Sequence, residues 1–213
     1  MAGSSLSILL TRGLPPGLSN MDKKIQSIIS ASIDVKQQIL QNREMLLLIE
    51  EVVKLTVNAL QDGNRLWFCG NGGSAADAQH LAAEFTGRFY KDRRALPAEA
   101  LHCNTSYLTA VANDYSFDEV YARMVEGVCS EGDILFGFST SGNSINICNA
   151  FETANSKGVI TVAFTGATGG KIKNMTQFLF NIPSTDTPRI QESHIMIGHI
   201  ICQLTEEEFF LTS

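Results

Sequence analysis

The sequence contains no apolar run that approaches the roughly 20 residues needed for a membrane-spanning helix. It also lacks a basic stripe, because 22 acidic residues outnumber 16 lysines and arginines and give a net charge of −6. These absences argue against a membrane protein and against nucleic acid as a main partner. The basic cluster from Arg88 to Arg94 is more simply explained as a solvated helix end, where the helix dipole favours cations.

Two further absences concern cysteine pairs and nucleotide motifs. The five cysteines are odd in number, scattered and mostly placed in apolar segments, without the short spacing of a cysteine-rich zinc site. Buried free thiols in a reducing compartment fit this pattern better than disulfides. The sequence also lacks the Gly-x-Gly-x-x-Gly and Gly-x4-Gly-Lys-[Ser/Thr] fingerprints. We therefore expect a cytoplasmic protein with no nucleotide cofactor.

The chain of 213 residues fits one main domain with additions at its N-terminus. Residues 1–20 are expected to be a disordered leader or an appended segment of artificial origin. Residues 21–62 show the apolar spacing of two helices, with a break near Gln41 and Asn42. A small sheet does not require both helices, so we expect them to serve oligomerisation, although packing within the chain explains them equally well. Residues 63–213 are expected to form the main domain.

From Asn64 onward, strand-like and helical segments alternate. The central strand-like runs, such as 134–136 and 160–164, are continuously apolar, which is typical of parallel strands covered on both faces. The pattern predicts a single doubly wound, flavodoxin-like α/β domain with about five parallel strands, preceded by the N-terminal helices. The expected strands are Arg65–Cys69, Ala98–Leu101, Asp133–Phe138, Val159–Phe164 and Phe178–Ile182. The expected helices are Ala75–Arg88, Phe117–Val128, Ser144–Lys157, a short one after Gly170, and one from Pro188 to about Phe209.

Three strand-end loops should lie along one edge of this sheet, where parallel sheets bind ligands. The glycine turn Gly70–Ser74 can present backbone N–H groups to an anionic or polyhydroxylated ligand. The loop Ser139–Ser144 carries four hydroxyls and an asparagine before a helix, which favours a phosphate monoester. A helix cap alone would need one such residue. The loop Thr165–Gly170 is equally compatible with a ligand loop and a tight turn.

Two helices carry the titratable groups. His80 and Glu84 are four residues apart and share one helix face, and Gln191 and His199 are eight apart, about two turns or 12 Å, on the last helix. An isolated buried histidine is more often structural, and His194, on another face, is expected to be a packing or capping residue. Taken together, however, the two helices could converge on a metal or on the reacting carbons of a substrate.

These motifs resemble those of the SIS (sugar isomerase) domain family and, within it, of the phosphoheptose isomerases, over residues 22–210. The motifs are Gly-Asn-Gly-Gly-Ser-Ala at 70–75, Asp77 followed by His80 and Glu84, Asn113-Asp114-Tyr115, the loop 139–144, and Pro183–Glu192 followed by Gly198-His199. Each motif alone is weak, but their combination is highly specific.

The resemblance implies an aldose–ketose isomerase that converts sedoheptulose 7-phosphate to D-glycero-D-manno-heptose 7-phosphate. That reaction is the first step of ADP- or GDP-heptose biosynthesis for lipopolysaccharide or capsule, usually performed by a cytoplasmic homotetramer. Glu84 and His199 would be catalytic. The implied substrate-binding residues are Asn71, Gly72, Gly73, Glu84, Asn113, Asp114, Ser139, Thr140, Ser141, Ser144 and Gln191. The implied ligands of one zinc ion per subunit are His80, Glu84, Gln191 and His199.

The residues support such chemistry independently, because an enediol reaction needs a base, an acid and stabilisation of an oxyanion. Since a carboxylate bound tightly to zinc is a poorer base, either the metal is labile or it polarises substrate oxygens while its coordination shifts. The site could also combine halves from neighbouring subunits. The competing hypothesis is a non-catalytic SIS-domain scaffold of the DnaA initiator-associating type. Such relatives lack the acid/base pair that this chain has at Glu84 and His199.

Overall fold

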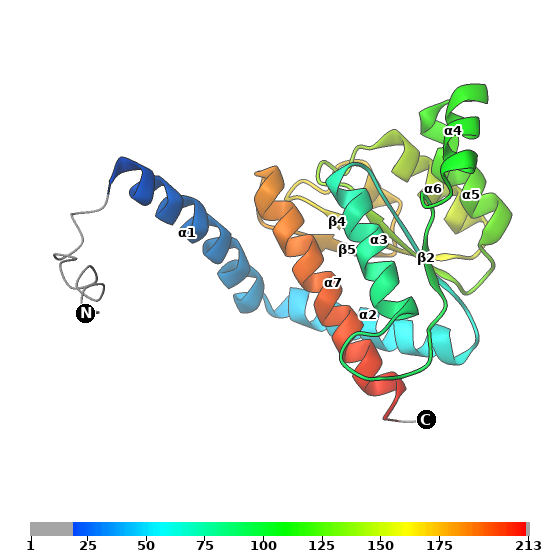
Figure 1. Ribbon diagram of the computed structural model, residues 1–213, viewed down its shortest axis with the longest axis horizontal. Coiled ribbons are helices and arrows are strands. Elements are labelled where there is room, and N and C mark those ends of the chain that lie inside the picture. Colours follow the sequence, from blue (N-terminus) through cyan, green and yellow to red (C-terminus); the bar gives the residue numbers. More distant parts are fainter. Residues whose placement is uncertain (1–18, 212–213) are drawn as a thin grey trace, which may run out of the picture.

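A five-stranded, all-parallel sheet forms the centre of the protein, as a computed structural model describing residues 19–211 shows (Figure 1). The strand order is β2-β1-β3-β4-β5. This confirms the predicted doubly wound α/β fold, and each predicted strand is present with its ends shifted by at most one residue. The strands are β1 (Leu66–Gly70), β2 (Ala98–Ala100), β3 (Ile134–Phe138), β4 (Ile160–Thr165) and β5 (Phe178–Asn181).

Helices cover both faces of the sheet. One face packs against α2 (Arg43–Gln61), α3 (Gly73–Thr86) and α7 (Thr187–Phe209), and the other packs against α5 (Val120–Val128) and α6 (Ile145–Ser156). Two 3-10 turns, η1 (Phe117–Glu119) and η2 (Ile172–Asn174), complete the second layer. None of the helices within residues 19–211 is long and apolar enough to cross a membrane.

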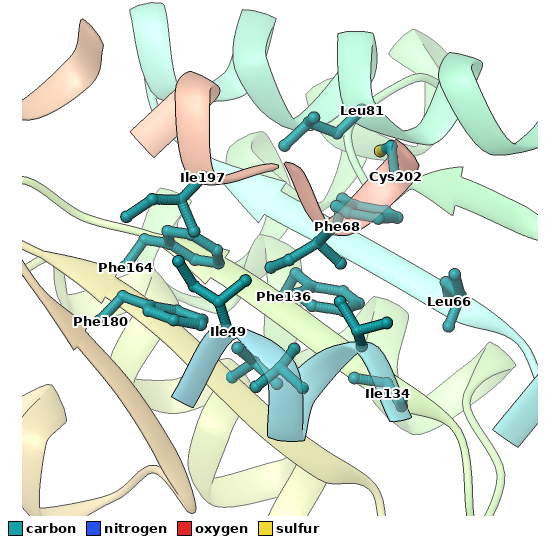
Figure 2. Packing of buried hydrophobic residues seen from close by; sticks show 14 of the residues in the cluster. Ile49, Leu66, Phe68, Leu81, Ile134, Phe136, Phe164, Phe180, Ile197 and Cys202 are labelled. Atoms are coloured by element: carbon teal, nitrogen blue, oxygen red, sulfur yellow. The ribbon is translucent and has the colours of Figure 1, made fainter. Parts of the chain in front are cut away.

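The two apolar layers follow from the alternation of side chains along each strand. In β1, Phe68 points into the layer of α2, α3 and α7, whereas Trp67 points into the layer of α5 and α6. Figure 2 shows the first layer, where stacked strand phenylalanines meet apolar residues of the helices. Phe68 and Phe136 stack with ring centroids 4.9 Å apart. Both faces of the sheet are therefore dry, which explains the continuously apolar strand sequences.

Helix α1 (Asn20–Gln41) projects from the body of the protein (Figure 1). It ends at Asn42, whose side chain accepts a hydrogen bond from Met45 N and caps α2, so the predicted break is confirmed. At its other end, Ser19 and Asp22 form a capping box, and the helix begins at Asn20, before the predicted boundary. The rest of the predicted leader, residues 1–18, lies outside the described residues.

Helix α4 (Thr105–Asp114) is a helix that the sequence did not predict. It buries Val111, while its other side chains are half-buried or exposed, so it has no clear apolar stripe. Its N-terminus is fixed by Asn104, whose side-chain oxygen accepts a hydrogen bond from Tyr107 N. The Tyr107 hydroxyl donates to Val120 O and attaches α4 to α5. Local capping and this tertiary contact therefore replace the missing periodicity.

Candidate active site

Close packing of α3 against α7 builds the titratable part of the site. The two helices meet at Gly198, where an added Cβ would lie 2.5 Å from Cδ1 of the buried Leu81. Because glycine has no side chain here, the helices approach closely enough for histidines on both to meet. The segments also pair in the same order along the chain: Gln191 lies against Gly73, and His199 lies against His80.

His80, Glu84 and His199 form one cluster within a single chain. The Nε2 of His80 lies 3.0 Å from Glu84 Oε1 and 3.1 Å from His199 Nε2. The Glu84 side chain is 24% exposed, so the cluster is accessible to a small molecule. Burial lowers the pKa of the His199 imidazole; the nearby His80 lowers it further, and Glu84 opposes this. A neutral His199 beside a carboxylate can exchange protons with a ligand.

The donor set of this cluster is suitable for zinc. Two imidazole nitrogens and a carboxylate oxygen, one atom from each residue, all lie within 4.8 Å of one another. Tetrahedral zinc with bonds of 2.0–2.1 Å would hold neighbouring donors about 3.3 Å apart, so small adjustments are sufficient. The fourth predicted ligand, Gln191, is placed differently: it lies about 12 Å further along α7 by helical rise. There it lines a cavity with Gly73 and Asp77.

A polar cleft of about 270 Å³ lies at the carboxyl ends of β3, β4 and β5. Thr140 and Ser141 of the predicted phosphate loop line it, while the Ser139 and Ser144 hydroxyls form a hydrogen bond of 2.9 Å with each other. Gly142 has a φ of +66°, and a Cβ there would overlap the backbone of Gly169. Glycine is therefore required where the loop 139–144 crosses the loop 165–170.

Sequence reasoning did not identify all the residues that line this cleft. The loop 165–170, equally compatible with a turn, contributes Gly166 to Thr168, and the segment that leads into the first residue of α7 contributes further hydroxyls. These hydroxyls belong to Ser184, Thr185 and Thr187. Their run before Pro188, which lies in the first turn of α7, has the same hydroxyl-rich composition as the phosphate loop and could have identified them.

The loop Gly70–Ser74, predicted to bind an anionic or polyhydroxylated ligand, leads into α3. Gly72 has a φ of +57°, and Ser74 N donates to Asn71 O over 3.0 Å. The Asn71 side chain forms two hydrogen bonds with Asn146 of α6, a residue that the sequence did not single out. The structure therefore connects this loop directly to the helix that follows the phosphate loop.

Two predicted substrate-binding residues lie apart from these cavities. Asn113 and Asp114 are exposed at the end of α4, where Asn113 Nδ2 donates to Asp114 Oδ1 over 2.9 Å. Neither residue lines the cleft at Thr140 or the cavity at Gln191. Among residues 19–211, neither cavity nor the Asn113–Asp114 hydrogen bond connects them to the other predicted site residues.

The remaining site residues follow α7 from its N-terminus. The cleft at Ile190 is followed by a cavity of about 240 Å³ at Gln191 and then, two helical turns on, by the cluster at His199. One end offers hydroxyls and two helix N-termini, and the other offers an acid/base pair. This order suits an elongated ligand with an anionic group at one end and a reacting carbonyl at the other.

Comparisons with known proteins identify the family to which this fold belongs. The sequence profile of the SIS domain family matches residues 29–166. A phosphoheptose isomerase of Aneurinibacillus thermoaerophilus is 51% identical over 190 residues, which cover 89% of this chain and 96% of that protein. The solved phosphoheptose isomerase of Neisseria gonorrhoeae is 38% identical with a TM-score of 0.82, covering 88% of this chain and 99% of the other. That of Francisella tularensis is 33% identical with a TM-score of 0.84, covering 89% and 100%.

Fold and site thus define an SIS-domain protein with a polar cleft at the carboxyl ends of its strands and a cluster of two histidines and a glutamate between α3 and α7. The coverage and identity of the relatives define it further. The chain belongs to the phosphoheptose isomerase family and is a sugar-phosphate isomerase. The alternative of a non-catalytic scaffold is not favoured.

Proposed function

We propose that the chain converts sedoheptulose 7-phosphate to D-glycero-D-manno-heptose 7-phosphate. The observation that carries this proposal is the placement of an acid/base cluster and a hydroxyl-rich cleft along one helix, α7. A ketose phosphorylated at its far end requires this separation, because its carbonyl and its phosphate lie several carbons apart. The names of relatives up to 56% identical support the same substrate.

The reaction moves a proton between C1 and C2. One of the pair Glu84 and His199 removes a proton from C1, while the other protonates the oxygen on C2, which gives an enediol. The enediol then loses the proton of its C1 hydroxyl and receives a proton on C2, so the C1 aldehyde forms and both groups return to their starting states. Burial keeps the pKa of His199 low, and a neutral imidazole can either accept or relay these protons.

The phosphate would lie in the cleft beside Thr140 and Ser141, where hydroxyls and the N-terminus of α6 favour an anion. Asn71, Gly72 and Gly73 would contact the sugar hydroxyls, together with Gln191, which lies beside Gly73. Asn113 and Asp114 remain predicted sugar contacts.

His80, Glu84 and His199 would hold zinc at one ion per subunit, and Gln191, the fourth predicted ligand, would have to reach the ion from two turns earlier on α7. When bound, zinc would polarise the oxygens of the substrate as a Lewis acid. The supporting observation is the spacing of the three donor atoms, which matches a zinc site.

The working form would be a cytoplasmic homotetramer that supplies heptose for lipopolysaccharide or capsule. Helix α1 supports assembly, because it carries four isoleucines that are each about half exposed. Covering such an apolar face with a second copy of the chain would remove it from water. These residues are Ile25, Ile28, Ile29 and Ile33.

Incubating the purified protein with sedoheptulose 7-phosphate and measuring aldose formation tests the proposal. Wild-type protein should convert the ketose, and Glu84→Gln should lose on the order of 10²- to 10⁴-fold in kcat, because a general acid/base group contributes that much. Full activity in Glu84→Gln would refute its role. Activity that is unchanged after chelation, in protein shown to be metal-free, would make zinc incidental.

A further inference from the structure

The side chains of Asn71 and Asn146 form a closed pair of hydrogen bonds. Asn71 Nδ2 donates to Asn146 Oδ1, and Asn146 Nδ2 donates to Asn71 Oδ1, each over 2.9 Å. One orientation of each amide satisfies both bonds, because turning either amide would place N–H against N–H and oxygen against oxygen. The pair therefore fixes the orientation of the Asn71 amide.

The position of the pair links two functional loops that are 75 residues apart in the sequence. Asn71 follows β1 in the loop that begins α3, and Asn146 lies in the first turn of α6, directly after the phosphate loop. Asn146 is 2% exposed, whereas Asn71 is half-buried and lies two residues before Gly73, which lines the cavity at Gln191. Burial makes Asn146 unsuitable as a ligand contact and suitable as a support for Asn71.

The backbone beneath Asn71 is held as well. The hydroxyl of Tyr121, itself 2% exposed, donates to Gly70 O, and Asn71 O accepts from Ser74 N. With backbone and amide both fixed, Asn71 retains one N–H and one oxygen lone pair that Asn146 does not use. These two groups are fixed in orientation before a ligand arrives, which saves the entropy of ordering them on binding.

We propose that Asn146 is a positioning residue for isomerisation: it holds the Asn71 amide in the orientation that binds the sugar, and it keeps the sugar loop in register with the phosphate loop. This inference rests on the proposed function. Asn146 acts through Asn71 and touches neither the phosphate nor the reacting carbons.

The test compares Asn146→Ala, Asn71→Ala and the double variant with wild type, using sedoheptulose 7-phosphate. Asn146→Ala should lower kcat/KM about tenfold, the effect of one hydrogen bond that is no longer aligned. The double variant should equal Asn71→Ala, because Asn146 has no further effect once its partner is absent. The inhibition constant of inorganic phosphate should change less than twofold, since neither asparagine lines the cleft that would hold the phosphate.

Two further variants are compared: Asn146→Asp is a second change at the same position, and Asn149→Ala is a control on the same helix. Asn146→Asp keeps the volume but places a carboxylate oxygen opposite Asn71 Oδ1, so it should lower kcat/KM at least as much. Asn149 lies on the same helix and bonds to Asp118 O instead, so Asn149→Ala should behave as wild type. If Asn146→Ala fails to fold, Asn146→Asp and the calorimetric Kd of the same sugar phosphate serve as the measurements.

A value of kcat/KM within twofold of wild type in Asn146→Ala and Asn146→Asp would overturn the inference. Additive losses in the double variant, or an equal loss of phosphate inhibition, would overturn it too, because they indicate a general structural effect. If the wild-type protein binds the sugar phosphate but does not convert it, the proposed function is refuted. The role of Asn146 is then tested by comparing the Kd of the sugar phosphate between wild type and the same variants. Protein that neither binds nor converts the sugar phosphate would overturn both.

Discussion

Acidification should destabilise the folded protein through His194. This side chain is fully buried between the sheet and α7, with its ring centroid 5.7 Å from Phe164 and 6.0 Å from Phe138. Its Nε2 lies 3.2 Å from Thr165 O and must carry the proton of the neutral ring, since a carbonyl can only accept. Its Nδ1 has no hydrogen-bond partner among residues 19–211. A second proton would therefore enter a buried, apolar position.

Burial lowers the pKa of His194 from 6.5 to about 4, and the hydrogen bond to Thr165 O opposes this only in part. Between these two values the unfolded chain binds a proton that the folded chain does not, so stability falls as the pH falls. The full contribution is about 3 kcal/mol, reached below pH 4, and about 2 kcal/mol of it is lost between pH 7 and pH 5. Above pH 6.5 the side chain makes no pH-dependent contribution.

Urea unfolding of wild type and His194→Gln, at pH 7 and pH 5 and at one protein concentration, measures this effect. Glutamine does not titrate and keeps a donor for Thr165 O. The free energy of unfolding of wild type should fall by about 2 kcal/mol more than that of the variant, because other titrating groups are common to both proteins. An equal fall in the two proteins would refute the reasoning.

Two further substitutions test how the site is held together. Gly198→Ala should separate α3 from α7, because its Cβ would lie within 2.7 Å of two Leu81 carbons. Both the melting temperature and the isomerase activity should therefore fall. A variant with the melting temperature and activity of wild type would contradict this. Glu206→Gln should lower the free energy of unfolding by about 3–5 kcal/mol, because it breaks a buried ion pair with Arg93, whose side chain is 3% exposed. Chemical denaturation measures this, and Glu50→Gln, which breaks an exposed pair with Lys54, should leave the unfolding midpoint unchanged. Equal midpoints in the two variants would contradict the assigned difference in burial.

The fold was largely predictable because its strands are buried on both faces. Continuous apolar runs such as 134–136 and 160–164 identify parallel strands without reference to tertiary structure. The helix break at Asn42 was predictable from local signals as well. Helix α4 was not, since it is held by the capping of Asn104 and by Tyr107, and neither contact leaves a periodic pattern.

The site was predictable in its residue types and less so in its connections. The spacing of His80 and Glu84 indicated one helix face, but their contact with His199 depends on the close approach at Gly198. The pairing of Asn71 with Asn146 spans 75 residues and has no local signature. The hydroxyls before α7 were overlooked because a serine- and threonine-rich segment before a helix is also a common cap.

The most direct test of the central claim is the reaction in D₂O, followed by NMR of the sugar phosphate. In an enediol reaction the base that has taken the C1 proton exchanges it with solvent before C2 is protonated, so wild-type protein should form aldose with deuterium bound to C2. Glu84→Gln should abolish this incorporation, and Glu131→Gln, a change at an exposed position before β3, should not. Aldose formed without deuterium, or incorporation that is undiminished in Glu84→Gln, would contradict the account.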